Sequence, residues 1–202
     1  MLASMRRGVP SKNDMMQRCW GETPIMIAYH DNEWGVPLHD DRKLFEFLVL
    51  QGMQAGLSWS TILNKRENFR EAFSNFDARK VAKYDAKDIR RLMKDAGIIR
   101  NRLKIMAAIN NSKRFLDVQK EFGSFGNYIW AFVGNKPVTN KLKSFRKMPA
   151  RTELSDKISA DLRKRGFSFV GSTIIYAHMQ ATGMVNDHLV SCPRWKEIAQ
   201  MT

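Results

Sequence analysis

The chain has 202 residues, 44% of them hydrophobic, so it is long enough and apolar enough to bury a substantial core as one domain or two intimate halves. Its 34 Lys and Arg outnumber its 20 Asp and Glu, and the net charge of +14 favours a polyanionic partner, nucleic acid first and an anionic membrane surface second. Two cysteines are too few for a disulfide scaffold, and no apolar run is long enough for a membrane span or a signal peptide, so we expect a cytoplasmic protein of a reducing compartment.

The start of the chain is polar and basic and shows no periodicity. Residues 1–16 are therefore expected to be a disordered extension, and Met15 and Met16 offer later translation starts. Residues 17–195 are expected to form a single domain, followed by a C-terminal tail at 196–202.

The first helical pattern begins at Asp40 or Asp41, either of which can cap a helix. Helical spacing then places on one face Leu44, Phe45, Leu48 and Gln51. Glycines bracket a break, and a second helix is expected with a buried stripe of Ile62, Leu63, Phe69, Ala72 and Phe73. The basic residues of that helix are expected to face solvent, namely Lys65, Arg66 and Arg70.

Short helices are expected after Asp77 and after Asp85, where Asp88 can complete a capping box. Gly97 is expected to end the second of them with a positive φ. Ile98 and Ile99 then lead into a long helix whose apolar positions are Leu103, Ile105, Met106 and Ile109. One more helix is expected at 125–133, ending at Gly134.

Residues 134–151 lack apolar periodicity and contain six lysines and arginines, so they are expected to form a surface connection between two helical lobes. Two further helices are expected at about 155–165 and 172–182, with Gly166 and Gly183 as their ends. No segment shows strand alternation bounded by hairpin turns. The expected fold is all-α.

Each of the two cysteines stands near a histidine. Cys19 precedes His30 near one end of the chain, and His188 precedes Cys192 by four residues near the other. Such a set suits a closed tetrahedral zinc site of Cys2His2 type, which would tie the two ends together. The alternative is two buried thiols and two ordinary histidines, because the interval from Cys19 to His30 is longer than is usual within a ligand pair.

Five segments in order are specific enough to compare with known families. They are Tyr29-His30-Asp31-Asn32-Glu33-Trp34-Gly35, Gln54-Ala55-Gly56-Leu57-Ser58-Trp59, Asp95-Ala96-Gly97-Ile98-Ile99-Arg100, Arg165-Gly166-Phe167-Ser168-Phe169-Val170-Gly171 and Val185-Asn186-Asp187-His188. These segments resemble the signatures of the 3-methyladenine DNA glycosylase I family. The resemblance implies an all-α, helix-hairpin-helix DNA glycosylase-like fold of helical lobes, in which a structural zinc joins the terminal segments. The ligands that it implies are Cys19, His30, His188 and Cys192.

In the resembled family the counterparts of Trp20, Tyr29 and Trp59 help line the slot for a base flipped out of DNA. A π-rich slot favours a purine alkylated at N3, because that purine is cationic. Two positions depart from the family pattern. Gln51 stands where a glutamate normally reads the base edge, and Met26 stands where a tyrosine is often found. We assign Gln51 as the candidate catalytic and base-reading residue and Met26 as an apolar wall.

The turn at Gly97 and Ile98 is a candidate DNA contact. Its backbone amides can bind a phosphate beside a helix N-terminus, within the positive charge of Arg100, Arg102 and Lys104. The alternative is an ordinary tight turn between two packed helices.

A second candidate contact is the break before Trp59. Gly56 and Leu57 could approach the DNA there and fill the gap left by a flipped nucleotide. The alternative is that Leu57 is the first core residue of the next helix.

The function expected is a monofunctional DNA glycosylase that cleaves the N-glycosidic bond of alkylated purines, chiefly 3-methyladenine, in base excision repair. Its partner would be double-stranded DNA with alkylated bases, and we expect a monomer. The alternative from another class is a zinc-stabilised module that binds damaged DNA with little or no cleavage, which Gln51 and Met26 favour. A glycosylase for another modified base is a third interpretation.

Overall fold

The computed structural model describes residues 18–201, and the extension expected at 1–16 lies outside them. The described chain is mostly helical, as expected. Its α-helices are α1 (Pro24–Asn32), α2 (Asp41–Gln54), α3 (Trp59–Asn64), α4 (Arg66–Ala72), α5 (Ala78–Val81), α6 (Ala86–Lys94), α7 (Arg102–Phe122), α8 (Phe125–Ala131), α9 (Glu153–Lys164), α10 (Ser172–Ala181) and α11 (Pro193–Ala199). The remaining elements are two 3-10 turns, η1 (Ser74–Phe76) and η2 (Phe145–Lys147), and two strands, β1 (Val138–Thr139) and β2 (Val185–Asn186).

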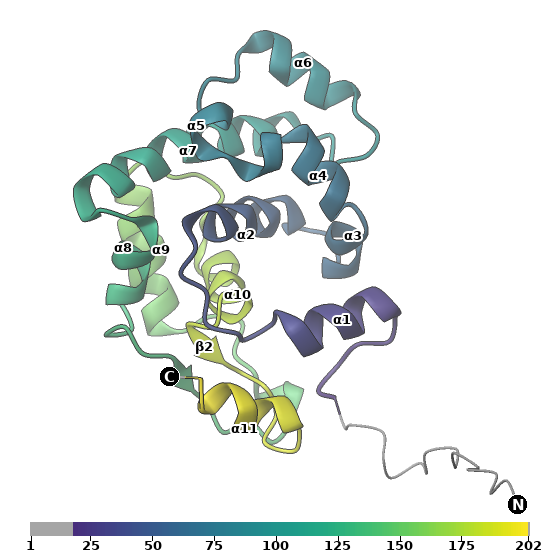
Figure 1. Ribbon diagram of the computed structural model, residues 1–202, viewed down its shortest axis with the longest axis vertical. Helices are drawn as coiled ribbons and strands as arrows, with labels where there is room; N and C mark the ends of the chain where they lie inside the picture. The colour runs from purple at the N-terminus through teal and green to yellow at the C-terminus, as the bar shows by residue number, and fades with distance from the viewer. Residues whose placement is uncertain (1–17, 202) are drawn as a thin grey trace, which may run out of the picture.

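Helix α2 lies in the middle of the molecule, with α4 to α7 above it, α8 and α9 to its left, and α10 and α11 below it in Figure 1. Every residue from Leu44 to Met53 is buried, so this part of the helix has no solvent face, whereas Arg42 and Lys43 of the first turn are exposed. A helix enclosed in this way has apolar residues on more than one face, whereas a surface helix has a single apolar stripe. Its start is fixed by Asp40, whose carboxylate accepts a hydrogen bond from the N–H of Lys43 at 3.0 Å.

The expected second helix is two helices, because the chain bends at Lys65 between α3 and α4. The expectation that Arg66 faces solvent is wrong. Its guanidinium is buried, donates to Glu46 at 2.6 Å and to Glu33 at 2.8 Å, and lies 5.1 Å from the ring centre of Phe47. This pairing neutralises Glu46 inside the fold, where an unpaired carboxylate would be very costly.

Helix α6 begins with the capping box that the sequence predicts at Asp85 and Asp88. Its end differs from the expectation, since α6 stops at Lys94 and Gly97 does not have a positive φ. Glycine is required at this position because a side chain would not fit. A Cβ at Gly97 would lie 2.9 Å from Asp95 Oδ1 and 3.0 Å from Asn68 Cβ.

Helix α7 buries only two of the four apolar positions named for it from the sequence. Ile105 and Ile109 are buried, but Leu103 is 68% exposed and Met106 is 43% exposed. The helix packs on α2, α5, α6 and α8 through other positions, including Ala108 and Phe115. Periodicity alone does not choose between two adjacent faces that both carry apolar residues.

Residues 134–151 are more than a surface connection. Their strand β1 pairs in parallel with β2, Val138 with Val185 and Thr139 with Asn186, and an isolated bridge joins Leu142 to Leu189. This short pair is the exception to the all-α expectation. Two-residue strands show no alternation that a sequence pattern could display.

The chain after residue 195 continues the fold, because α11 runs to Ala199 and Ile198 is fully buried. The boundary expected for a C-terminal tail therefore falls inside a helix. Among the helices of residues 18–201, none is both long enough and apolar enough to cross a membrane.

We predict that Gly183→Ala destabilises the protein severely. Gly183 ends α10 with a φ of +71°, and a Cβ there would overlap the backbone of Val36 and Pro37. Gly134→Ala is the matched control, since Gly134 has a φ of +61° but no atom within 4 Å of the place that a Cβ would take. Both variants should lose about 1–2 kcal/mol for the left-handed backbone, and Gly183→Ala about 1–3 kcal/mol more for the overlap. Urea unfolding measures the difference, and equal losses would contradict the packing that we describe.

Candidate functional site

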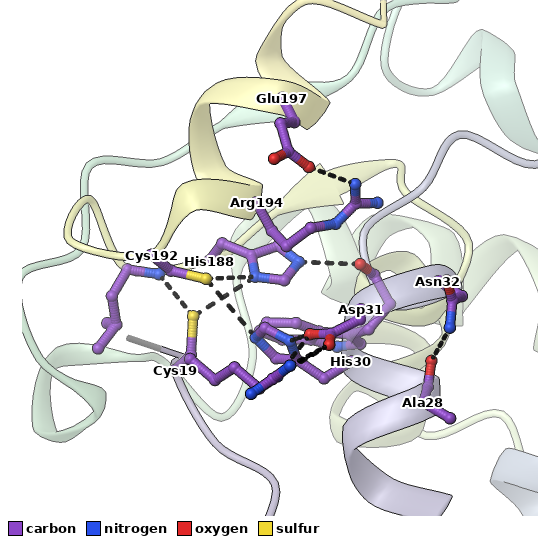
Figure 2. Close-up of polar contacts among 12 residues, drawn as sticks. Cys19, Ala28, His30, Asp31, Asn32, His188, Cys192, Arg194 and Glu197 are labelled. Carbon is purple, nitrogen blue, oxygen red and sulfur yellow. Dashed lines mark hydrogen bonds and ion pairs between the residues drawn. The ribbon is translucent and has the colours of Figure 1, made fainter. Parts of the chain in front are cut away.

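Four side chains from the two ends of the domain form one cluster: Cys19, His30, His188 and Cys192. Their ligand atoms all lie within 4.8 Å of one another. Cys19 Sγ is 3.4 Å from His188 Nδ1, and Cys192 Sγ is 3.7 Å from His30 Nε2 and 3.6 Å from His188 Nδ1. Figure 2 shows these groups turned towards a common centre. A tetrahedral ion with bonds of about 2.0–2.3 Å needs donor atoms about 3.3–3.8 Å apart, which these distances fit.

Each histidine of the cluster is oriented through its other ring nitrogen. His30 Nδ1 is 2.7 Å from Asp31 Oδ1, and the Asp31 carboxylate in turn accepts from Arg18 at 2.8 Å. His188 Nε2 is 2.9 Å from the carbonyl oxygen of Trp34. These contacts leave His30 Nε2 and His188 Nδ1 pointing at the cysteines, which is how metal-binding histidines are usually held.

The buried position also sets the protonation of the cluster. Burial lowers the pKa of His188 to about 4 and lowers the pKa of His30, although Asp31 acts against the shift at His30. Burial raises the pKa of the Cys19 thiol to about 12, against the N–H of Leu189, which donates to its Sγ at 3.1 Å. Neutral imidazole is the form that binds metals, and a bound cation lowers thiol pKa values. The cluster could therefore hold a metal ion.

Local structure explains how the four residues meet. His30 lies in the last turn of α1, and Cys192 is the N-cap residue of α11. His188 follows strand β2, which the pairing with β1 fixes in place. The N–H of Gly35 donates to the carbonyl of Gln180 at 2.9 Å, which brings the end of α1 against α10. The two ends of the described chain are thus joined through the fold itself.

A pocket of about 210 Å³ lies beside the cluster. It is lined by all five residues for which base binding is expected, Trp20, Met26, Tyr29, Gln51 and Trp59. The aromatic rings form a connected wall, with ring centres 5.9 Å apart for Trp20 and Tyr29 and 5.4 Å apart for Tyr29 and Trp59. Such a wall can bind a planar cation through its π faces.

Six further residues line the pocket, and none of them is expected from the sequence to bind a base: Trp34, Gln54, Phe145, Met148, Ala177 and Gln180. Gln54 follows Gln51 by three residues on α2, so helical spacing could have found it. Phe145 is an exposed aromatic residue within a basic stretch, which is also a usable signal. Ala177 and Gln180 lie one turn apart on α10, and nothing local marks them.

Two polar atoms of the pocket residues are unsatisfied. Gln51 is 4% exposed, and within residues 18–201 neither its buried Oε1 nor the buried Nε1 of Trp59 has a hydrogen-bond partner. Buried polar atoms without partners are rare in native proteins. They mark a place where a ligand with its own donors and acceptors would complete the hydrogen bonding.

The turn between α2 and α3 is exposed at Gly56 and Leu57. Gly56 has a φ of +78° and open space around its Cβ position, and Leu57 is 42% exposed rather than a core residue. Lys104 holds the backbone that leads into this turn. Its ammonium donates to the carbonyls of Met53 at 2.9 Å and Ala55 at 2.6 Å, where it meets the negative end of α2. Lys104 is only 8% exposed. It therefore does not belong to the exposed positive charge around the Gly97 turn, in contrast to the expectation from the sequence.

The loop around Gly97 is partly closed to a ligand. The N–H of Gly97 already donates to Asp95 Oδ1 at 2.7 Å, and Ile98 is buried in the core. The expectation that all of these amides point outward is therefore wrong for Gly97. Arg100 and Arg102 are exposed beside the loop, as expected.

Comparison with known proteins finds close relatives over most of the chain. The family model described as methyladenine glycosylase matches residues 19–195. DNA-3-methyladenine glycosylase 1 of Escherichia coli (strain K12) is 50% identical over 179 residues, which are 88% of this chain and 96% of that protein. DNA-3-methyladenine glycosylase of Haemophilus influenzae is 49% identical over 181 residues, which are 89% of this chain and 98% of that protein.

Solved structures agree with the sequence comparison. A crystal structure of 3-methyladenine DNA glycosylase I matches with a TM-score of 0.85 and 49% identity, over 88% of this chain and 98% of that one. A single-substitution variant of a 3-methyladenine DNA glycosylase I, solved in complex with 3-methyladenine, matches with a TM-score of 0.86 and 35% identity over 88% and 97%. The chain described here belongs to the methyladenine glycosylase family.

Proposed function

We propose that this protein is a monofunctional DNA glycosylase that hydrolyses the N-glycosidic bond of alkylated purines, chiefly 3-methyladenine, in DNA. The observation that carries the proposal is the aromatic pocket with the unsatisfied Gln51 Oε1 and Trp59 Nε1. Relatives named as 3-methyladenine DNA glycosylases, one of them in complex with 3-methyladenine, support it.

The pocket suits this reaction because the leaving group needs little help. Alkylation at N3 makes the base cationic, so it departs as a neutral molecule when the glycosidic bond breaks, and a water molecule then forms the new bond to the sugar carbon and releases a proton to solvent. The rings of Trp20, Tyr29 and Trp59 favour the cationic base over a neutral one, and Gln51 offers a hydrogen bond to its edge. The protein binds and orients the flipped nucleotide, while the DNA phosphates lie near the positive charge that develops on the sugar.

No carboxylate lines the pocket among residues 18–201. Asp31 is held by Arg18 and His30, and Glu33 is held by Arg66 at 2.8 Å. Both acidic residues of the signature segment therefore support the structure and do not face the base. The reaction that we propose depends on the leaving group and on binding, without a carboxylate base.

The second candidate function is recognition of damaged DNA without cleavage. The observation that favours it is the same absence of a carboxylate in the described pocket, with Gln51 and Met26 at the positions that depart from the family pattern. Release of free base separates the two candidates.

The exposed turn of Gly56 and Leu57 is proposed to enter the DNA beside the flipped nucleotide, because an exposed apolar side chain on an open turn can act as a wedge. Arg100 and Arg102 are proposed to contact phosphates from the α6–α7 loop. Lys104 has a different role, since it fixes the carbonyls that precede the Gly56 turn.

The Cys19, His30, His188 and Cys192 cluster is proposed to hold one zinc ion. Four protein ligands close the site, so the ion would be structural and would supply no step of bond cleavage. Its contribution would be to join the terminal segments and to set the position of Trp20, which follows Cys19 directly.

We predict one zinc ion per chain in protein produced with zinc available, measured by elemental analysis. Cys192→Ala should lose the ion and about 3 kcal/mol or more of the free energy of unfolding, because binding of a structural metal contributes to folding. His39→Ala is the control, since His39 is exposed and stacks on Trp130 away from the cluster. Full stability of the metal-free Cys192→Ala protein would rule out a structural ion.

DNA affinity should fall steeply with salt. In a plot of the logarithm of the association constant against the logarithm of the salt concentration, each neutralised phosphate contributes a slope of about −0.9. Arg100→Gln should reduce that slope by about 1 without changing base preference. Arg42→Gln is the matched control, because Arg42 lies at the start of α2 while Gln51 lies near its end. A fluorescence titration of a DNA duplex at several salt concentrations makes the measurement, and an unchanged slope for Arg100→Gln would remove that residue from the interface.

The test of the function is release of free base from methylated DNA by the purified protein, followed by chromatography. In the same assay Gln51→Glu should increase excision about tenfold, because a hydrogen bond from a cationic base to a carboxylate is worth roughly 1.5–3 kcal/mol. Gln200→Glu adds the same charge at an exposed position that does not line the pocket and should have no effect. Equal rates for wild type and Gln51→Glu would show that residue 51 does not read the base. DNA binding without any base release would favour the second candidate function.

A further inference from the structure

One buried carboxylate has no part in the reaction described so far. Asp187 is 1% exposed and accepts three hydrogen bonds, from Tyr176 Oη at 2.6 Å, Asn140 Nδ2 at 2.7 Å and Gln180 Nε2 at 2.7 Å. Each donor comes from a different place in the fold, respectively the middle of α10, the residue after β1 and the end of α10. Asp187 is thus fully engaged, and its contact with Gln180 reaches the wall of the base pocket.

That contact fixes the orientation of the Gln180 amide. Its Nε2 donates to Asp187 Oδ2 at 2.7 Å and to Met148 Sδ at 3.3 Å, so both amide hydrogens are engaged by protein groups. An ionised carboxylate can only accept, so the NH2 group and not the carbonyl must face Asp187. The Oε1 of Gln180 then remains for the pocket, since both hydrogen bonds of this side chain within residues 18–201 are made by Nε2.

Gln51 behaves differently. Its buried Oε1 has no hydrogen-bond partner within the described residues, so no bond to that atom fixes the amide, which can turn over and offer an acceptor or a donor. A group that serves both kinds of base edge does not discriminate between them. A fixed acceptor does, because it rejects a second acceptor that would be buried against it.

We propose that Gln180 is a specificity-determining residue of the pocket and that Asp187 is the positioning residue that fixes it. The Oε1 of Gln180 accepts a hydrogen bond from the exocyclic amino group of an alkylated adenine. An alkylated guanine presents a carbonyl oxygen at the same position. This second acceptor is disfavoured there because it would be buried against the Oε1 of Gln180. The inference rests on the proposed glycosylase function and assigns its preference for adenine to α10.

The strength of the effect follows from the charge on the base. The amino group of a cationic adenine is a stronger donor than that of a neutral one, and hydrogen bonds to charged groups exceed ordinary ones. Losing such a bond, or burying two acceptors together, changes binding by about tenfold. The ratio of adenine to guanine excision should therefore depend on Gln180 by at least that factor.

The experiment uses methylated DNA that contains both 3-methyladenine and 3-methylguanine and measures the ratio of the two free bases released. A ratio within one DNA does not depend on how much of a variant is folded. Gln180→Met keeps the shape of the side chain but removes the acceptor, so it should lower the adenine-to-guanine ratio about tenfold. Asp187→Asn supplies a donor as well as an acceptor, so Gln180 is no longer fixed and the ratio should fall by a smaller factor.

Asp161→Asn is the matched control. Asp161 accepts from Tyr128 Oη at 2.7 Å, much as Asp187 accepts from Tyr176, but it lies on α9 and does not line the pocket. Its ratio should equal that of the wild type. A wild-type ratio in Gln180→Met overturns the proposal even if Asp187→Asn shows a change. Release of neither base by the wild-type protein is a separate result, since it refutes the glycosylase function itself.

Discussion

From Leu44 to Met53 helix α2 is enclosed by protein on every side, and this enclosure dictates what each polar group there must do. From Leu44 to Met53 only two polar side chains are buried there, Glu46 and Gln51. Glu46 is neutralised by Arg66 and Arg70 at 2.6 and 2.9 Å. Gln51 has no such partner and stands at the pocket. On a buried stretch of helix, a polar group with protein partners serves the structure, and a polar group without them is available to a ligand.

The pocket and the cluster of Cys19, His30, His188 and Cys192 share neighbouring residues of the same short segment. Tyr29 lines the pocket while the next residue, His30, enters the cluster. The ring of Trp34 lines the pocket while its carbonyl orients His188. The ring of Trp20 lies 5.0 Å from that of His30. Anything that moves the cluster must move three of the aromatic residues that line the pocket, so the junction of the chain ends and the shape of the pocket depend on one set of contacts.

Much of this was accessible from the sequence because it is local. The caps at Asp40 and Asp85 and the aromatic residues of the signature segments are defined by their immediate neighbours. The failures have non-local causes. Arg66 lies on a face that periodicity assigns to solvent, and only the approach of Glu33 and Glu46 makes it buried. Residues 134–151 acquire their structure by pairing with a segment near residue 187. Gln180 is held by Asp187, only seven positions further on, but the turn between α10 and β2 that brings them together shows no periodic pattern in the sequence.

The separation of the cluster's two halves along the chain also has a consequence for how the protein is made. Cys19 and His188, whose Sγ and Nδ1 lie 3.4 Å apart, are 169 positions apart in sequence. Synthesis proceeds from the N-terminus, at about 5–20 residues per second, so the first two ligands leave the ribosome well before the last two exist. Helices with local caps can form during that interval, but the junction of the ends cannot. The cluster can therefore close, and the aromatic walls of the pocket can take their final positions, only after Cys192 has been synthesised.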